Sequence, residues 1–409
     1  MEVRGHHHFP PLPISYNFSH PQPHLHFPPF FIPPHLHLPQ SVIVLLLIPS
    51  DHQTLHKPFL HCSGTEEAGF PPPPSSSAMA SFPPPASLFV IILFAVPFLV
   101  ESQLSLDYYQ KTCPDFAKIV HETVSKKLAT SPTAAAATMR LLSNDCLVGG
   151  CDGSLLIASN AFNHAERDAE INLSLPGDAF DVVARTKVTL ELSCPGIVSC
   201  SDVLAQATRD LIAITGGPSY NVPLGREDSL VSKSSEVEGN IPKMNQTIDE
   251  LIKLYTAKGF TIQEMVALYG GRTIGFSNCK EFGDRIFKFS KSTPTDPEIH
   301  PKFAEALKKS CEGYEKNPGM SAYSDVVTPG KFDNVYFQNL LKGLGLSASE
   351  HAMVKDARTR KFVEMYAGNQ ALFFKDFSSA MEKLSVREVK TGGKGEVRRK
   401  CDVFNSIQT

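Results

Sequence analysis

The sequence predicts a mainly α-helical single domain that is exported to an oxidising compartment. Apolar residues recur at helical spacing through most of the chain after residue 103. Two of these periodic segments begin with capping boxes, at Thr247 to Glu250 and at Thr261 to Glu264. Eight of the nine cysteines follow an apolar run at residues 88–100, and an even number behind such a run is typical of four disulfides in a secreted protein.

The first 102 residues differ in composition from the rest of the chain. Residues 1–85 hold 19 of the 32 prolines and residues 1–61 hold 11 of the 15 histidines, so we expect residues 1–78 to form no packed core. They are either an upstream extension that is not part of the expressed protein or a histidine-rich metal-binding tail. Residues 79–102 have the length and apolar centre of a signal peptide, which leaves a domain at residues 103–409.

Charge argues against a nucleic-acid partner. Removing two basic and five acidic residues before residue 103 leaves 39−2=37 basic against 42−5=37 acidic side chains. A neutral domain without a basic block lacks the electrostatic footprint of a nucleic-acid binder. The apolar run at residues 88–100 is too short to span a bilayer, so we expect no membrane contact in the mature form.

The first helices follow from periodicity and capping signals. Apolar residues at i, i+4 spacing predict a helix from Ile119 to Leu128. Ser131 and Pro132 suit the N-cap and first position of the next helix, because proline has no N–H to leave unpaired there. That helix places Arg140 and Asn144 one turn apart on one face.

The loop after this helix is rich in oxygen ligands and bracketed by two cysteines, Cys146 and Cys151. Hard oxygen atoms in a tight loop suit Ca²⁺. The candidate ligands are the side chains of Asp145, Asp152 and Ser154 and the carbonyls of Val148 and Gly150. Paired zinc knuckles are absent from the cysteine spacing, so zinc is the poorer interpretation.

Further helices are predicted downstream. Periodic segments run from Phe180 to Leu192 and from Ser201 to a stop before Gly216. Apolar and aromatic residues at helical spacing continue from Phe362 to Leu384. Side chains in such a pattern more often form a core than a cofactor site, so we assign this last segment to the core.

The stretch around Arg140 is similar to the distal helix and first calcium site of the class III secretory plant haem peroxidases. The matching positions are Arg140, Asp145, Cys146, Val148, Gly150, Cys151, Asp152 and Ser154. Asn144 stands where the family has its distal histidine. The resemblance implies a plant-type haem peroxidase fold, mainly α, with two helical halves around a central haem cleft.

A second stretch, from Leu268 to Gly275, resembles the family's proximal segment. Arg272 stands where the family has the histidine that binds the haem iron, and Glu350 where it has the carboxylate that orients that histidine. Pro242 matches the proline at the haem edge that meets aromatic substrates. The resemblance therefore assigns cofactor-binding positions to Arg272 and Glu350 and a substrate position to Pro242.

The resemblance also implies two Ca²⁺ sites, haem b and a disulfide pattern. The second calcium site would use Thr273, Asp325, Thr328, Asp333 and the carbonyl of Lys331. The implied disulfides are Cys113–Cys194, Cys146–Cys151, Cys200–Cys401 and Cys279–Cys311. From the spacing alone, eight cysteines permit 105 connectivities.

The resemblance implies a monomeric peroxidase that oxidises small phenolic molecules with hydrogen peroxide. Such enzymes act in the cell wall or the vacuole and in the response to oxidative stress. The chemistry needs an imidazole on the iron, a base that titrates near neutrality and a cation beside the breaking O–O bond. Arg140 supplies the cation, but the amide of Asn144 cannot shuttle a proton and Arg272 has no lone pair for a metal.

The sequence therefore predicts weak or absent haem binding and impaired turnover. Two hypotheses remain. In the first, the protein is a non-catalytic binding or structural protein of the wall. In the second, it is an active haem peroxidase with an unexpected axial ligand, or the expressed sequence differs at the two histidine positions. His351 follows Glu350 directly and is the candidate replacement ligand, although all four histidines after residue 102 are expected at the surface.

Three local predictions follow from these substitutions. We expect an ion pair between Arg272 and Glu350, because the longer carboxylate would reach the guanidinium and neutralise a charge that is costly to bury. We expect Asn172 to have lost the partner that it has in the family. Asn245 begins an exposed glycosylation sequon, whereas the sequon at Asn172 is expected to be buried and unmodified.

Overall fold

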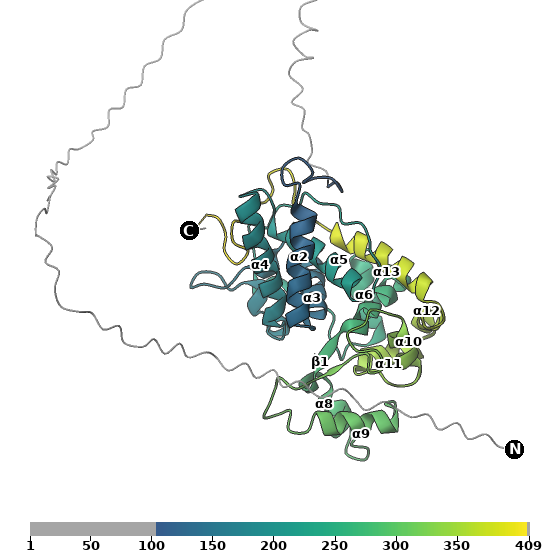
Figure 1. Ribbon diagram of the computed structural model, residues 1–409. Helices are drawn as coiled ribbons and strands as arrows, with labels where there is room; N and C mark the ends of the chain where they lie inside the picture. The colour runs from purple at the N-terminus through teal and green to yellow at the C-terminus, as the bar shows by residue number, and fades with distance from the viewer. Residues whose placement is uncertain (1–103, 407–409) are drawn as a thin grey trace, which may run out of the picture. The chain divides into compact units, whose positions relative to one another are not determined.

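A computed structural model of the chain describes residues 104–406. The extension at residues 1–78, the signal sequence at 79–102 and the expected first residue of the mature domain, Gln103, lie outside the described residues. Within 104–406 the fold is mainly α-helical, as predicted, with twelve α-helices, short 3₁₀ segments and one two-stranded ribbon (Figure 1). No helix in this part of the chain is long and apolar enough to cross a membrane.

The first helical group comprises four helices that pack on one another. They are α2 (Phe116–Thr130), α3 (Ala134–Val148), α4 (Gly177–Ser193) and α5 (Cys200–Ile214). Three 3₁₀ turns, η1 (Ser154–Leu156), η2 (Glu166–Asp168) and η3 (Glu170–Asn172), lie between α3 and α4. Val120 and Val124 of α2 are fully buried, as the i, i+4 pattern predicts.

The start of α3 differs from the prediction by two residues. The N–H of Ala134 donates to the carbonyl of Ser131, so residues 131–134 form a tight turn before the helix begins at Ala134. The Ser131 hydroxyl donates to Asp178 at 2.6 Å instead of capping α3. A tertiary partner on α4 therefore replaces the local capping role that the sequence suggested.

The second group contains six of the helices that follow residue 247. They are α6 (Ile248–Ala257), α7 (Ile262–Tyr269), α10 (Val335–Leu341), α11 (Ala348–Lys355), α12 (Ala357–Gly368) and α13 (Gln370–Ser385). Both predicted capping boxes are confirmed at the starts of α6 and α7. Phe337, Phe373 and Phe377 meet in an aromatic core, which confirms that the periodic segment at 362–384 builds core.

A smaller lobe joins two helices to a ribbon. It contains β1 (Phe276–Asn278), α8 (Cys279–Phe287), α9 (Pro301–Ser310) and β2 (Ser321–Tyr323), and Figure 1 shows it at the lower end of the helical body. The strands are antiparallel, with Phe276 opposite Tyr323. Phe282, Phe303 and Leu307 form a core of their own in this lobe.

One short segment, η5 (Gly270–Ile274), connects the two helical groups. It packs on α3 from the first group and on α7, α10 and α13 from the second. A side chain at Gly270 would place its Cβ 2.3 Å from Phe373 Cε2, so only glycine fits there. At Gly271 a Cβ would lie 2.9 Å from Met139 Cε of α3. These two close contacts fix the position of the next residue, Arg272.

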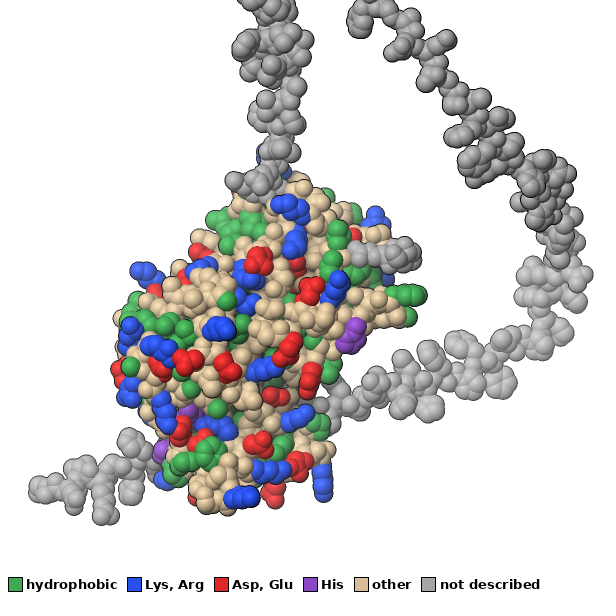
Figure 2. All heavy atoms as spheres, turned by 180° about the vertical axis from the view of Figure 1, so that it is seen from behind, with side chains coloured by type: hydrophobic (Ala, Val, Ile, Leu, Met, Phe, Trp, Pro, Cys, Tyr) green, Lys and Arg blue, Asp and Glu red, His purple; other side chains and the backbone are tan. Residues whose placement is uncertain are grey.

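Four disulfides cross-link the described chain. They join Cys113 to Cys194, Cys146 to Cys151, Cys200 to Cys401 and Cys279 to Cys311, the pairs that the resemblance implies. The pair at 200 and 401 ties the start of α5 to the C-terminal segment. Figure 2 shows basic and acidic side chains interspersed over one face of the molecule, without a large block of one sign on that face.

Candidate functional site

Arg140 and Asn144 lie one turn apart on α3, as predicted. The Arg140 guanidinium donates to the carbonyl of Ile171 at 3.3 Å, and to the carbonyl and hydroxyl of Ser174 at 3.1 and 2.7 Å. All three acceptors are neutral. Arg140 is an exposed residue, and among residues 104–406 it forms no ion pair with an acidic side chain.

Asn144 has a buried partner. Its amide nitrogen donates to the side-chain oxygen of Asn172 at 2.9 Å, and the Asn172 amide donates in turn to the carbonyl of Glu166 at 2.8 Å. The prediction that Asn172 had lost its partner is therefore wrong, because an asparagine at position 144 supplies a donor of its own. Both side chains are at least 96 % buried, so an unpaired amide here would be costly.

The predicted ion pair between Arg272 and Glu350 is confirmed. Arg272 Nη1 donates to Glu350 Oε1 at 3.2 Å. The Glu350 side chain is fully buried, whereas 29 % of the Arg272 side chain is exposed. The pair thus joins a carboxylate inside the second helical group to a cation at the edge of solvent.

The Glu350 carboxylate is held by two more groups besides Arg272. Its Oε2 accepts from the backbone N–H of Ser347 at 2.8 Å in the capping box of α11, and its Oε1 accepts from the Tyr336 hydroxyl at 2.9 Å. Burial raises the pKa of Glu350, but Arg272 and these two donors outweigh burial and leave the pKa below its ordinary value. Glu350 is therefore ionised at neutral pH.

The rest of the Arg272 guanidinium has only weak partners. Nη2 lies 3.1 Å from the sulfur of Met244, and the guanidinium carbon lies 5.5 Å from the centre of the Tyr269 ring. Burial lowers the pKa of Arg272, but Glu350, Tyr336 and Tyr269 together raise it more, so the side chain stays protonated. A permanently protonated guanidinium has no lone pair and cannot ligate a metal.

Arg140 and Arg272 influence each other electrostatically. Surrounding protein and the positive charge of Arg272 together lower the pKa of Arg140 to about 10, with a small opposing effect from Glu281. Arg140 is still protonated at neutral pH. The site therefore brings two cations together, and within the described part of the chain only Arg272 has a carboxylate partner.

The prediction that all four histidines lie at the surface holds for His121 and His164 and is wrong for His351. His351 is buried on α11, and its Nδ1 lies 3.0 Å from Arg285 Nη2 and 3.2 Å from the carbonyl of Ser347. Burial lowers the pKa of this imidazole. The Nδ1 contacts of His351 are thus Arg285 of α8 and the N-cap residue of its own helix.

The residues predicted for the first calcium site lie together. The Asp145 carboxylate accepts from the N–H groups of Gly153 and Leu155, and Asp152 accepts from the N–H of Ser154. Burial and the neighbouring Asp152 raise the pKa of Asp145 to about 7, and burial and Asp145 raise that of Glu166 to about 9.

Two atoms at this first site are buried without a hydrogen-bond partner. They are Ser154 Oγ and Glu166 Oε2. A hard cation would satisfy both of them and the crowded carboxylates, so the residues fit Ca²⁺. The ligand role of the predicted residues remains a prediction.

The second predicted calcium site is also assembled. Thr328 Oγ1 lies 3.1 Å from Asp325 Oδ2 and 3.2 Å from Asp333 Oδ1, and Thr273 Oγ1 lies 3.2 Å from the carbonyl of Lys331. Asp333 Oδ2 is buried and accepts no hydrogen bond, although Lys331 Nζ lies 3.3 Å away. This donor set fits Ca²⁺ as well, because it combines carboxylates with neutral oxygens.

No group of three or more His, Cys, Asp or Glu side chains within 104–406 has the arrangement of a metal site. Both calcium candidates consequently depend on carbonyl and hydroxyl oxygens in addition to their acidic side chains. That composition is usual for Ca²⁺ and unusual for zinc.

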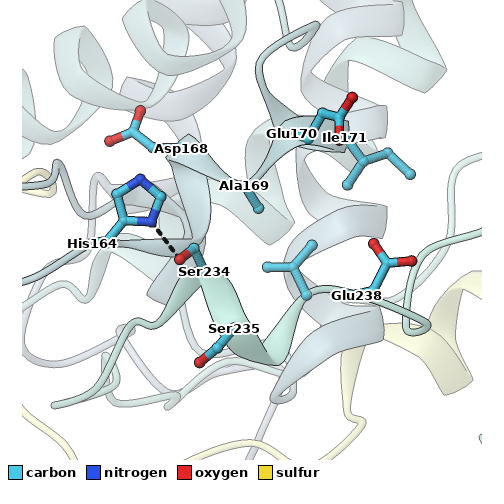
Figure 3. A pocket seen from close by; sticks show the side chains of 9 residues that line it. His164, Asp168, Ala169, Glu170, Ile171, Ser234, Ser235 and Glu238 are labelled. Carbon is cyan, nitrogen blue, oxygen red and sulfur yellow. Dashed lines mark hydrogen bonds between the residues drawn. The ribbon is translucent and has the colours of Figure 1, made fainter.

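A separate pocket of about 250 Å³ lies between η2, η3 and η4 (Ser234–Glu236). Figure 3 shows the carboxylates of Asp168, Glu170 and Glu238 around it, with His164 Nδ1 2.5 Å from the Ser234 hydroxyl. None of the predicted site residues lines it, Pro242 included. Ile171 lines it, and the carbonyl of Ile171 accepts from Arg140.

Sequence reasoning missed two partners of the Arg272–Glu350 pair. Tyr336 and Met244 are distant in sequence from both residues and carry no local pattern that predicts the contact. The capping box at Ser347 to Glu350 could have been predicted from the sequence, since its spacing is the same as in the boxes at Thr247 and Thr261.

Comparisons with known proteins show the family to which the chain belongs. A family model described as "Peroxidase" matches residues 120–369. Peroxidase 41 of Arabidopsis thaliana is 56% identical over 323 residues, which is 78% of this chain and 97% of the relative. Peroxidase 65 of the same plant is 55% identical over 304 residues, or 74% and 90%, and Peroxidase 31 is 52% identical over 319 residues, or 78% and 98%. With its mainly helical fold and four disulfides, the chain therefore belongs to the plant peroxidase family.

Proposed function

We propose that this chain is a secreted plant peroxidase family member with little or no peroxidase turnover, which acts as a binding protein outside the cell. The observation that supports this most directly is the ion pair between Arg272 and Glu350. It occupies the positions where the family's iron ligand and its orienting carboxylate are expected. The fold, the disulfides and both calcium candidates are retained around that pair.

The proximal residues do not fit haem. Stable haem binding in this family would need an imidazole nitrogen directed at the iron, with its far N–H held by a carboxylate. Arg272 offers only N–H groups, and Glu350 is already committed to Arg272, Tyr336 and the cap of α11. His351 is buried with its Nδ1 beside Arg285 and the carbonyl of Ser347, which does not favour it as a replacement ligand.

The distal residues do not fit peroxide cleavage either. A base must take a proton from peroxide and return it to the leaving oxygen, which requires a group that titrates near neutrality. Asn144 is an amide, and its nitrogen is engaged by Asn172 at 2.9 Å. Loss of general acid–base catalysis alone lowers a rate by roughly 10²- to 10⁴-fold. Arg140 alone retains the type of side chain that the family reaction uses.

Haem reconstitution tests this proposal. The mature chain from residue 103 is refolded with Ca²⁺ and titrated with haem b, and the Soret band and the H₂O₂-dependent oxidation of a phenol are recorded. We expect no stoichiometric Soret complex and no turnover above free haem. The matched control is the double variant Asn144→His/Arg272→His, which should gain both signals if the scaffold is intact. A tight Soret complex with rapid turnover in the unaltered chain would contradict the proposal and favour an unexpected axial ligand.

A further inference from the structure

The two cations of the site project from adjoining backbone positions. Met139 of α3 packs against Gly271 of η5, where an added Cβ would lie 2.9 Å from Met139 Cε. Arg140 and Arg272 are the next residue after each member of this contact. Two guanidinium groups therefore leave neighbouring points of α3 and η5, at the junction between the two helical groups.

Negative charge does not balance the two guanidinium groups. Among residues 104–406, Arg140 forms no ion pair and donates only to neutral oxygens of Ile171 and Ser174. Arg272 has one carboxylate, and that carboxylate also serves Tyr336 and the N–H of Ser347. The carboxylate of Glu281 is close enough to oppose the repulsion slightly, but it forms no ion pair with Arg140. The positive charges of Arg140 and Arg272 therefore repel each other without full neutralisation by the described residues.

Both arginines keep some exposure to solvent. The Arg140 side chain is exposed, and 29 % of the Arg272 side chain is accessible although the flanking Gly271 and Thr273 are buried. Three partly exposed apolar residues are near them in the fold or the sequence. Met139 precedes Arg140, and the sulfur of Met244 contacts Arg272. The hydroxyl of Ser277 lies 3.9 Å from the same sulfur, and Phe276 precedes Ser277 in β1. An anion that enters here meets two cations and an apolar surround.

We propose that Arg140 and Arg272 together bind a small organic carboxylate whose apolar or aromatic part rests against Met139, Met244 and Phe276. Guanidinium groups match the geometry of a carboxylate and form charge-assisted hydrogen bonds with it. Bound there, the carboxylate would relieve the repulsion between the two arginines. This inference rests on the proposed function, because it assigns Arg140 and Arg272 to an anion and not to a haem site.

Benzoate and its neutral analogue benzamide test the site in the mature chain with Ca²⁺ present. Isothermal titration should show saturable binding of benzoate, and benzamide should bind at least tenfold more weakly because it lacks the charge. Arg140→Gln leaves the Arg272–Glu350 pair intact and should weaken benzoate binding by about tenfold to a hundredfold, the loss expected for one charge-assisted contact. Arg140→Lys should recover part of it. Raising the salt concentration should weaken benzoate and leave benzamide unchanged.

Arg185→Gln is the matched control, since Arg185 is an exposed arginine of α4 that pairs with Asp181. It should leave benzoate binding unchanged. Equal affinity for benzoate and benzamide, or equal loss in the Arg140 and Arg185 variants, would overturn the inference. Absence of both benzoate binding and a Soret complex overturns the carboxylate site alone, whereas a stoichiometric Soret complex overturns the proposed function.

Discussion

Glu350 Oε1 accepts a hydrogen bond from Arg272 Nη1 at 3.2 Å, while Glu350 Oε2 closes the capping box at the start of α11. One carboxylate thus serves both a helix terminus and a cation on the connecting segment η5. The pair stands where a haem ligand and its orienting carboxylate are expected from the family pattern. The contribution of this ion pair to the unfolding free energy therefore measures its structural role.

Removal of Arg272 should be more costly than removal of both partners. Arg272→Gln leaves a fully buried carboxylate without its cation, and we expect a loss of about 2–3 kcal/mol in unfolding free energy, below the usual cost for a fully buried pair because Arg272 is partly exposed. The double variant Arg272→Gln/Glu350→Gln keeps a side chain suited to the capping box and should lose only about 1 kcal/mol. Urea unfolding measures both. Equal losses in the single and double variants would show that the pair is not coupled.

The contribution of Glu350 should disappear in acid. Its pKa is lowered in the folded protein, so the stability that it contributes is present above the unfolded-state pKa of about 4.3 and is lost as pH falls through the folded pKa. The difference in unfolding free energy between the unaltered chain and Glu350→Gln should therefore be constant from pH 6 to pH 7 and shrink below about pH 4. A difference that is the same at pH 3 and pH 7 would contradict this account.

Gly270 should not tolerate even a methyl group. A Cβ there would lie 2.3 Å from Phe373 Cε2 and 2.8 Å from Phe337 Cζ, both buried in the aromatic core. We expect Gly270→Ala to lower the unfolding free energy by about 1–3 kcal/mol through overpacking. Gly177→Ala is the control, because nothing lies within 4 Å of its Cβ position. That variant should be neutral or slightly stabilised, and a similar loss in both would exclude packing as the cause.

Calcium should stabilise the fold through two independent sites. Chelation should lower the melting temperature, and Ca²⁺ at a hundred times its dissociation constant should restore about 2.7 kcal/mol for each site. Asp333→Asn removes a charge from the second site and should abolish only that part of the stabilisation. Mg²⁺ should substitute poorly, because it demands a smaller octahedral arrangement. Identical calcium titrations in the variant and the unaltered chain would remove Asp333 from the ligand set.

Asn245 should carry an N-linked glycan when the chain is secreted from plant cells. Its side chain is exposed, and Thr247 completes the sequon while it also caps α6. Asn245→Gln should lower the mass by one glycan, whereas Thr247→Ser should keep both the sequon and the cap. Asn172 is buried beside Asn144 and should remain unmodified. A glycan on Asn172, detected by mass spectrometry of peptides, would contradict the burial argument.

The sequence predicted most local features of the fold because they depend on neighbouring residues. Val120 and Val124 were buried as their spacing required, and the capping boxes at Thr247 and Thr261 began helices as expected. The start of α3 was misplaced, since the Ser131 hydroxyl bonds to Asp178 of another helix. The lobe of α8, α9 and the ribbon was not predicted at all, because its strands are only three residues long.

The amino-acid sequence by itself determined the chemistry of the site. It placed at position 144 an amide that does not titrate near neutrality, and at position 272 a permanent cation without a lone pair, and folding changes neither property. Only the tertiary structure decided the partners. Asn144 donates a hydrogen bond to Asn172, and Arg272 contacts Glu350 and Met244. His351 is buried beside Arg285. Such contacts join residues far apart in the chain, and their energies depend on burial and distance, which no local pattern encodes.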